Sequence, residues 1–153
     1  MNLRENAMGE HHRHGHDHEH EHHRKEIHVV KGREKFSMES HSHDGASVVS
    51  GECTLSAENP EIVRTMLAEQ MQRLGDWVNE KEGYIGHIKA GFSTEHTESF
   101  SITERKVQCY SPENTLIHIH LAAIVFMIPL DELKEQVKNI FLTLTADADG
   151  QKE

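Results

Sequence analysis

The sequence has little cysteine and no long apolar run, and each shortage excludes a class of protein. Cys53 and Cys109 are far apart and form no CxxC pair, which predicts buried thiols rather than a disulfide or a redox pair. The longest apolar stretch, residues 116–128, is interrupted by His118 and His120 and is too short to cross a bilayer. The N-terminus lacks the apolar core of a secretion signal, so we expect a cytoplasmic protein.

Basic residues are also scarce. Residues 45–153 carry nine Lys or Arg against seventeen Asp or Glu, and residues 1–44 carry seven against nine. An acidic body repels phosphate groups, which argues against nucleic acid and an anionic membrane surface as partners. No GxxxxGK[ST] loop and no GxGxxG before a helix is present. Any nucleotide-driven step would therefore need a partner GTPase.

Histidine, in contrast, is abundant in residues 11–23, HHRHGHDHEHEHH, which we call the tract. Imidazoles at this density have almost nothing apolar to bury, whereas neutral imidazole is a preferred ligand of nickel, zinc, copper and cobalt. The interleaved Arg13, Asp17, Glu19 and Glu21 distinguish the tract from a plain purification tag. The predicted ligands are His11, His12, His14, His16, His18, His20, His22 and His23.

The spacing within the tract indicates exchangeable binding. Histidines two apart on an extended chain lie about 7 Å from each other, whereas each bonds to a metal at about 2.0–2.1 Å. The chain must therefore coil around an ion, with many equivalent choices of ligand. Residues 1–44 as a whole are too polar to offset the entropy of folding, and we predict a disordered tail without metal. Met38 is an alternative start that would leave only His41 and His43 of this segment.

The remaining sequence predicts one α+β domain over residues 45–145, followed by a disordered C-terminus over 146–153. The element order is βαβββα, which gives a four-stranded, mostly antiparallel sheet with two helices on one face. The helix starts are marked by Asn59-Pro60 and by Pro129. The predicted strands are 46–57, 84–93, 98–110 and 116–128, and the predicted helices are 59–82 and 129–145.

Two helices cover only one face of such a sheet. The other face, expected to carry Val48 and Ile85, needs a cover of its own. We therefore predict a homodimer that stacks these faces or pairs edge strands.

A second metal site is predicted within the domain. His118 and His120 are two apart on a strand and so share a face, and His87 is expected to meet them from a neighbouring strand. Glu52 or Glu104 could add an oxygen ligand. Cys53 with His87 would make a nucleophile and a base, but no third residue is available to orient them.

The tract, residues 11–23, resembles the histidine-rich segments of nickel and zinc metallochaperones, including hydrogenase- and urease-maturation GTPases and their accessory proteins. This resemblance implies metal storage and delivery to an apo-metalloenzyme or a metal-insertion GTPase. We therefore expect a protein that binds, stores or delivers divalent Ni, Zn or Co, without catalytic residues of its own. One alternative is a small metal-dependent enzyme or sensor with its site at His87, His118 and His120. Another is a dimeric regulatory module whose tail is incidental.

Overall fold

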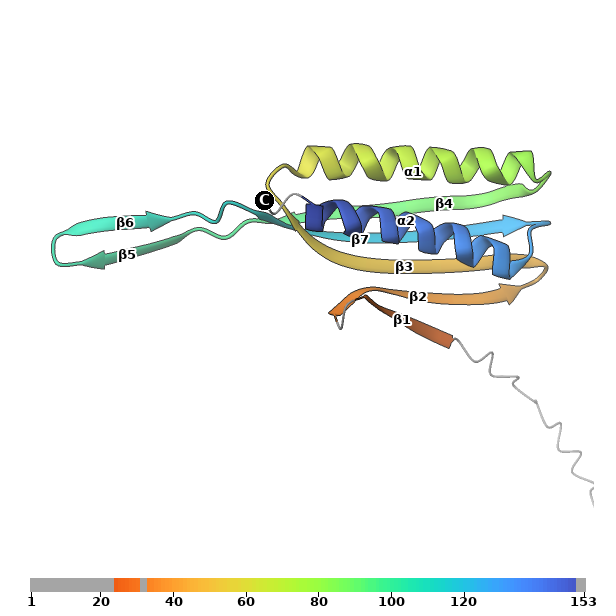
Figure 1. The fold of residues 1–153 in the computed structure, drawn as a ribbon, viewed down its shortest axis with the longest axis horizontal. Coiled ribbons are helices and arrows are strands. Elements are labelled where there is room, and N and C mark those ends of the chain that lie inside the picture. Colours follow the sequence, from red (N-terminus) through yellow and green to blue (C-terminus); the bar gives the residue numbers. More distant parts are fainter. Residues whose placement is uncertain (1–23, 31–32, 151–153) are drawn as a thin grey trace, which may run out of the picture.

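The computed structural model describes residues 24–30 and 33–150, and it is an α+β fold as predicted (Figure 1). Both predicted helices are present, and they lie on one face of an antiparallel sheet. The elements are β1 (Arg24–Val30), β2 (Arg33–His43), β3 (Ala46–Ala57), α1 (Pro60–Glu80), β4 (Tyr84–Glu95), β5 (Ser99–Thr103), β6 (Lys106–Tyr110), β7 (Thr115–Phe126) and α2 (Leu130–Gly150). Neither helix is long and apolar enough to cross a membrane.

The main sheet of the described chain has five strands in the order β1-β2-β3-β7-β4, not the four that the sequence predicted. Each neighbouring pair is antiparallel. Strands β3 and β4 both flank β7 and are therefore parallel to each other, with α1 as the crossover between them. This arrangement is a split β-α-β unit, to which β1 and β2 are added at one edge.

Strands β1 and β2 lie within residues 1–44, where the sequence analysis predicted a tail without strands. Phe36 and Met38 of β2 point toward the helices, and each is 2% exposed. Only these two large apolar residues alternate with polar ones in a histidine-rich segment. The local pattern therefore does not indicate a strand. On β1, Glu26 points toward the same side and pairs with Lys134 of α2 at 2.5 Å.

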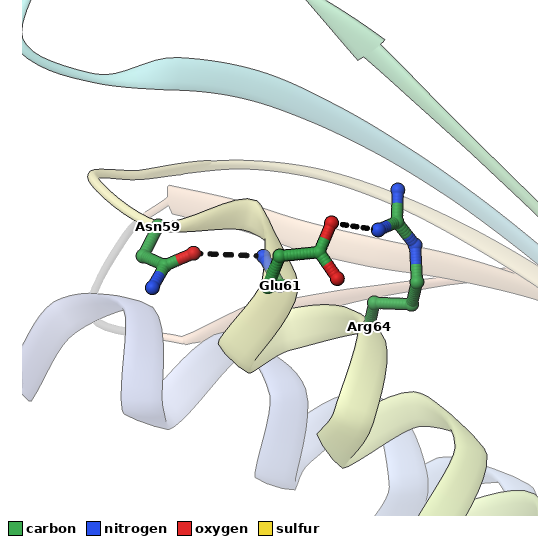
Figure 2. Close-up of polar contacts among 3 residues, drawn as sticks. All are labelled: Asn59, Glu61 and Arg64. Carbon is green, nitrogen blue, oxygen red and sulfur yellow. Dashed lines mark hydrogen bonds and ion pairs between the residues drawn. The ribbon is translucent and has the colours of Figure 1, made fainter.

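Helix α1 begins where the Asn59-Pro60 pair predicted. The Asn59 side chain accepts a hydrogen bond from the backbone N–H of Glu61 at 3.0 Å, and Glu61 pairs with Arg64 one turn later (Figure 2). The Arg64 guanidinium lies over the Phe92 ring of β4, 4.9 Å from its centroid. The buried stripe consists of Val63, Leu67, Leu74 and Val78. These contacts place α1 along β4 (Figure 1).

Helix α2 covers β3 and β2. Its Phe141 ring stacks on Phe36, with centroids 5.4 Å apart. Gly51 of β3 lies directly beneath this ring, where an added Cβ would overlap Phe141. The helix continues to Gly150, beyond the predicted end at residue 145, although the sequence there is polar.

A bulge in β4 changes which residues face the helices. The register shifts between Ile85 and His87, so that Tyr84 pairs with Phe126 and Ile85 with Val125. Because Val125 is buried beneath the helices, Ile85 lies on the helix side, near Gly75 of α1. Tyr84 lies on the opposite side. The prediction that Ile85 lies on the face away from the helices is therefore wrong, because a bulge reverses the alternation of a strand.

The predicted strand 98–110 is a separate hairpin. Within the described residues, β5 and β6 pair only with each other and form a two-stranded sheet. Figure 1 shows them extending away from the end of the main sheet. All ten strand residues are exposed, and Cys109 is therefore an exposed thiol rather than the predicted buried one.

Candidate metal-binding face

The eight histidines of the tract, His11 to His23, lie outside the described residues. The described candidates lie on the open face, by which we mean the side of the main sheet away from the helices. On β7, Ile117, Ile119 and Leu121 are buried toward the helices. His118 and His120 alternate with them and so point to the open face, as their spacing predicted.

His118 lies between a hydroxyl and a carboxylate. Its Nδ1 is 3.0 Å from Thr54 Oγ1 on β3, which is its cross-strand partner. Its Nε2 is 3.2 Å from Glu95 Oε2 at the end of β4. The side chain is 37% exposed and that of Glu95 is 63% exposed, so solvent reaches the cluster directly.

His120 has its own carboxylate. Its Nδ1 is 3.3 Å from Glu52 Oε2, and the two residues are opposite each other on β7 and β3. Ser37 of β2 donates to the other oxygen of Glu52 at 3.5 Å. The side chain of His120 is 66% exposed, so a ligand can approach the ring from solvent. Of the two predicted oxygen donors, Glu52 is near the histidines, whereas Glu104 lies in the β5–β6 turn.

His87 is on the open face but is not brought to the other two histidines. It is opposite Ile124, whereas His120 is opposite Gly91. Four residues along β7 separate these positions, which is about 13 Å at the rise of a strand. The predicted grouping of His87 with His118 and His120 is therefore not formed within this chain.

The pairing of Cys53 with His87 is also absent. Cys53 is buried on the helix side of β3, while His87 is exposed on the other side of the sheet. Burial raises the pKa of the Cys53 thiol to about 12, which leaves it protonated and unreactive near neutral pH.

The open face is hollowed next to His120. A hollow of about 480 Å³ lies over small residues of three strands, among them Ser50, Gly91 and Ala122. Lys25, Glu39 and Lys89 stand around it with His120. A second hollow of about 380 Å³ adjoins it and reaches Thr54 and His118. Both histidines thus face space that a ligand or another protein surface could enter.

The arrangement supplies two pairs of ligands rather than a complete coordination shell. Imidazole nitrogen and carboxylate oxygen are both ligands of zinc and nickel. Among the residues that the structure describes, however, no group of three or more His, Cys, Asp or Glu is arranged to hold a metal ion. The order Thr54, His118, Glu95 also has the form of a hydroxyl, a base and an orienting acid. These groups stand in water rather than in the water-excluded surroundings that make such sets effective catalysts.

Sequence reasoning did not find Glu95 and Thr54. Glu95 falls just beyond the predicted end of its strand, and the contact of Thr54 with His118 depends on the β3–β7 register. His41 and His43, on β2, are opposite Val48 and Ala46 and lie on the same open face. No known family model matches the chain, and no curated protein matches it.

Proposed function

We propose that the protein binds divalent transition-metal ions (nickel, zinc or cobalt) through the histidines of the tract, and that it stores or delivers them. The observation that carries this proposal is the density of histidine in residues 11–23, eight in thirteen positions with carboxylates between them. Such a segment offers many overlapping ligand sets and so favours exchangeable binding. A role as an accessory protein in metalloenzyme maturation or metal homeostasis fits this behaviour, as does a cytoplasmic setting.

In this proposal the folded domain docks the tract onto a client, which would be a metal-insertion GTPase or an apo-metalloenzyme. Two features support the assignment. The tract ends at His23, and Arg24 begins β1, the edge strand of the sheet. The exposed hollow beside His120 lies on the same sheet, with Lys25 of β1 among its lining residues.

The second candidate is a metal-dependent enzyme or sensor that uses the open face itself. The distances of His118 to Glu95 and of His120 to Glu52 favour it, because each pair presents a nitrogen and an oxygen ligand together. Since His87 lies apart and the two pairs form no larger group, each pair would hold an ion by itself, with water or a substrate completing the shell.

Isothermal titration calorimetry separates the two. Wild-type protein is compared with a full-length variant in which all eight tract histidines are replaced by asparagine. A chain beginning at Gly45 is a poor control, because it removes β1, β2 and the buried Phe36. We expect the wild type to take up several ions near neutral pH and the variant to take up few or none. Uptake by the wild type should weaken below about pH 6.5, where protons compete for imidazole.

The opposite results are equally informative. If the variant retains one tightly bound ion, and His118→Asn in the same background removes it, the open-face site replaces the tract as the main site. If the wild type takes up no nickel, zinc, cobalt or copper, metal binding is excluded and the regulatory-module alternative remains.

A further inference from the structure

The β5–β6 hairpin, residues 99–110, which we call the arm, carries an uncovered apolar face. Phe100 is opposite Cys109, and Ile102 is opposite Val107. Directly opposed residues share a face, and so do residues two apart, so these four side chains form one surface. Phe100 is 67% exposed, Ile102 64% and Val107 60%.

An isolated two-stranded hairpin is at best marginally stable in water. The polar contacts that hold the arm lie at its base, where His96 Nε2 is 3.1 Å from Ser111 Oγ, and Ser111 is 3.5 Å from Glu98. At its tip, Glu104, Arg105 and Lys106 are adjacent and exposed, which gives the tip a net charge of +1. The arm thus has an apolar face and a weakly basic end, and it extends away from the main sheet (Figure 1).

A complementary surface lies at the opposite end of the sheet. Tyr84 (69% exposed), Ile124 (36%) and Phe126 (38%) point to the open face there, next to Met127 (74%). We call these four residues the far-end patch. The turns and helix ends at this end of the domain carry mostly acidic exposed residues, which are Asp44, Glu80, Lys81, Glu82, Asp131 and Glu132. On the open face itself, the polar neighbours of the patch are His41, His43 and His87.

We propose that the arm of one chain covers the far-end patch of a second copy, and that a two-fold axis repeats this contact in the other direction. Apolar side chains would meet apolar side chains, and the tip, with a net charge of +1, would approach the acidic end of the partner's domain. When two copies lie with their strands antiparallel, the arm of each copy can reach the far-end patch of the other. From Glu95 to the tip the arm spans about 30 Å at the rise of a strand, which is ample to cover a patch at the ends of β4 and β7.

The apolar area that the arm exposes favours a second copy over a different partner. The four side chains of the arm offer roughly 400–500 Å², whereas a stable interface needs about 800 Å² from each protein. The arm alone therefore provides about half of what is needed. A two-fold dimer uses both the arm and the far-end patch of each chain, which supplies the full area from surfaces already present.

Sedimentation velocity of the full chain, in the presence of EDTA so that metal ions cannot bridge tracts, gives the first test. We expect a dimer of twice 17.5 kDa. Phe100→Ser with Ile102→Ser, and separately Tyr84→Ser with Phe126→Ser, should each raise the dissociation constant at least tenfold. Ile62→Ser is the matched control, because Ile62 is an apolar residue of α1 that is 46% exposed; it should leave association unchanged.

Mixing the arm variant with the patch variant gives the second test. Each homodimer would have two damaged contacts, whereas the mixed dimer would have one intact contact, so mixing should restore association. An Ile124→Cys substitution should also form an intersubunit disulfide with Cys109 on oxidation, since Cys53 is buried. Thermal melting by circular dichroism should show that the arm variant remains folded.

Three results would overturn the proposal. A wild-type chain that stays monomeric at every concentration would show that the arm meets something other than a second copy. A patch variant that dimerises as well as the wild type, with Cys109–Cys109 cross-links, would show that arms pack on arms. Loss of association without recovery on mixing would exclude the reciprocal contact.

Discussion

Replacing Phe36 with alanine tests whether β2 is part of the folded domain. Phe36 is 2% exposed and stacks on Phe141 of α2. Truncation of a buried phenylalanine costs about 3–5 kcal/mol, of which the ring stacking accounts for about 0.5–1.5 kcal/mol. A domain of this size is stable by about 5–15 kcal/mol, so the variant should lose a large part of its free energy of unfolding.

Urea unfolding followed by the fluorescence of Trp77 measures this loss. Trp77 is the single tryptophan and packs against the core from α1, so it reports on the domain far from the substitution. With a slope of about 2 kcal/mol/M, a loss of 4 kcal/mol lowers the midpoint by about 2 M.

Phe100→Ala is the matched control for this measurement. It removes the same atoms from the exposed arm and, with the chain kept dilute, should change the free energy of unfolding by less than about 0.5 kcal/mol. If Phe36→Ala lowered the free energy of unfolding as little as the control, β2 would not belong to the cooperative unit. The prediction that residues 1–44 form a tail outside the domain would then hold. A chain started at Met38 would lack both β1 and Phe36, and we expect it to be destabilised at least as much.

Three further predictions concern the glycines and cysteines of the domain. Gly51→Ala should destabilise the domain by about 1–3 kcal/mol, because the new Cβ overlaps the Phe141 ring, whereas Gly91→Ala, with no atom within 4 Å, should be nearly neutral in the same urea assay. At pH 8 a thiol reagent should label Cys109 and spare Cys53, whose pKa of about 12 leaves roughly one thiolate in ten thousand. Above pH 9, the unfolded chain releases the Cys53 proton and the folded chain keeps it, so stability should fall by about 1.4 kcal/mol per pH unit up to pH 12. Cys53→Ala should flatten that part of the stability profile, and rapid labelling of both cysteines would contradict the burial of Cys53.

The features that the sequence predicted well are those fixed by local patterns. The helix starts at Asn59-Pro60 and Pro129 depend on capping and on the fixed φ of proline, and the apolar stripes of both helices follow a period that neighbouring residues alone determine. The sharing of one face by His118 and His120 is equally local, because side chains two apart on a strand always point the same way.

The features that the sequence did not predict depend on register and on distant packing. Strand β2 buries two apolar residues only because α2 and Phe141 lie above it. The bulge at Gly86 exchanges the faces of Tyr84 and Ile85, and nothing in the local alternation marks it. Segment 98–110 alternates as a strand should, but its turn at Glu104 folds it back on itself, and Glu104 has a positive φ of 69°.

The position of the tract relative to the open face affects how any metal experiment must be designed. Because the tract joins β1 at Arg24, ions that it captures as proposed would be held on the same chain as His118 and His120. Tethering of this kind corresponds to millimolar effective concentrations. An ion that keeps some tract ligands could then also take up a weak ligand pair such as His118 with Glu95, and this pair would resemble a strong site. The His118→Asn substitution is therefore informative only in the background that lacks the tract histidines, where the affinity of the open face is measured alone.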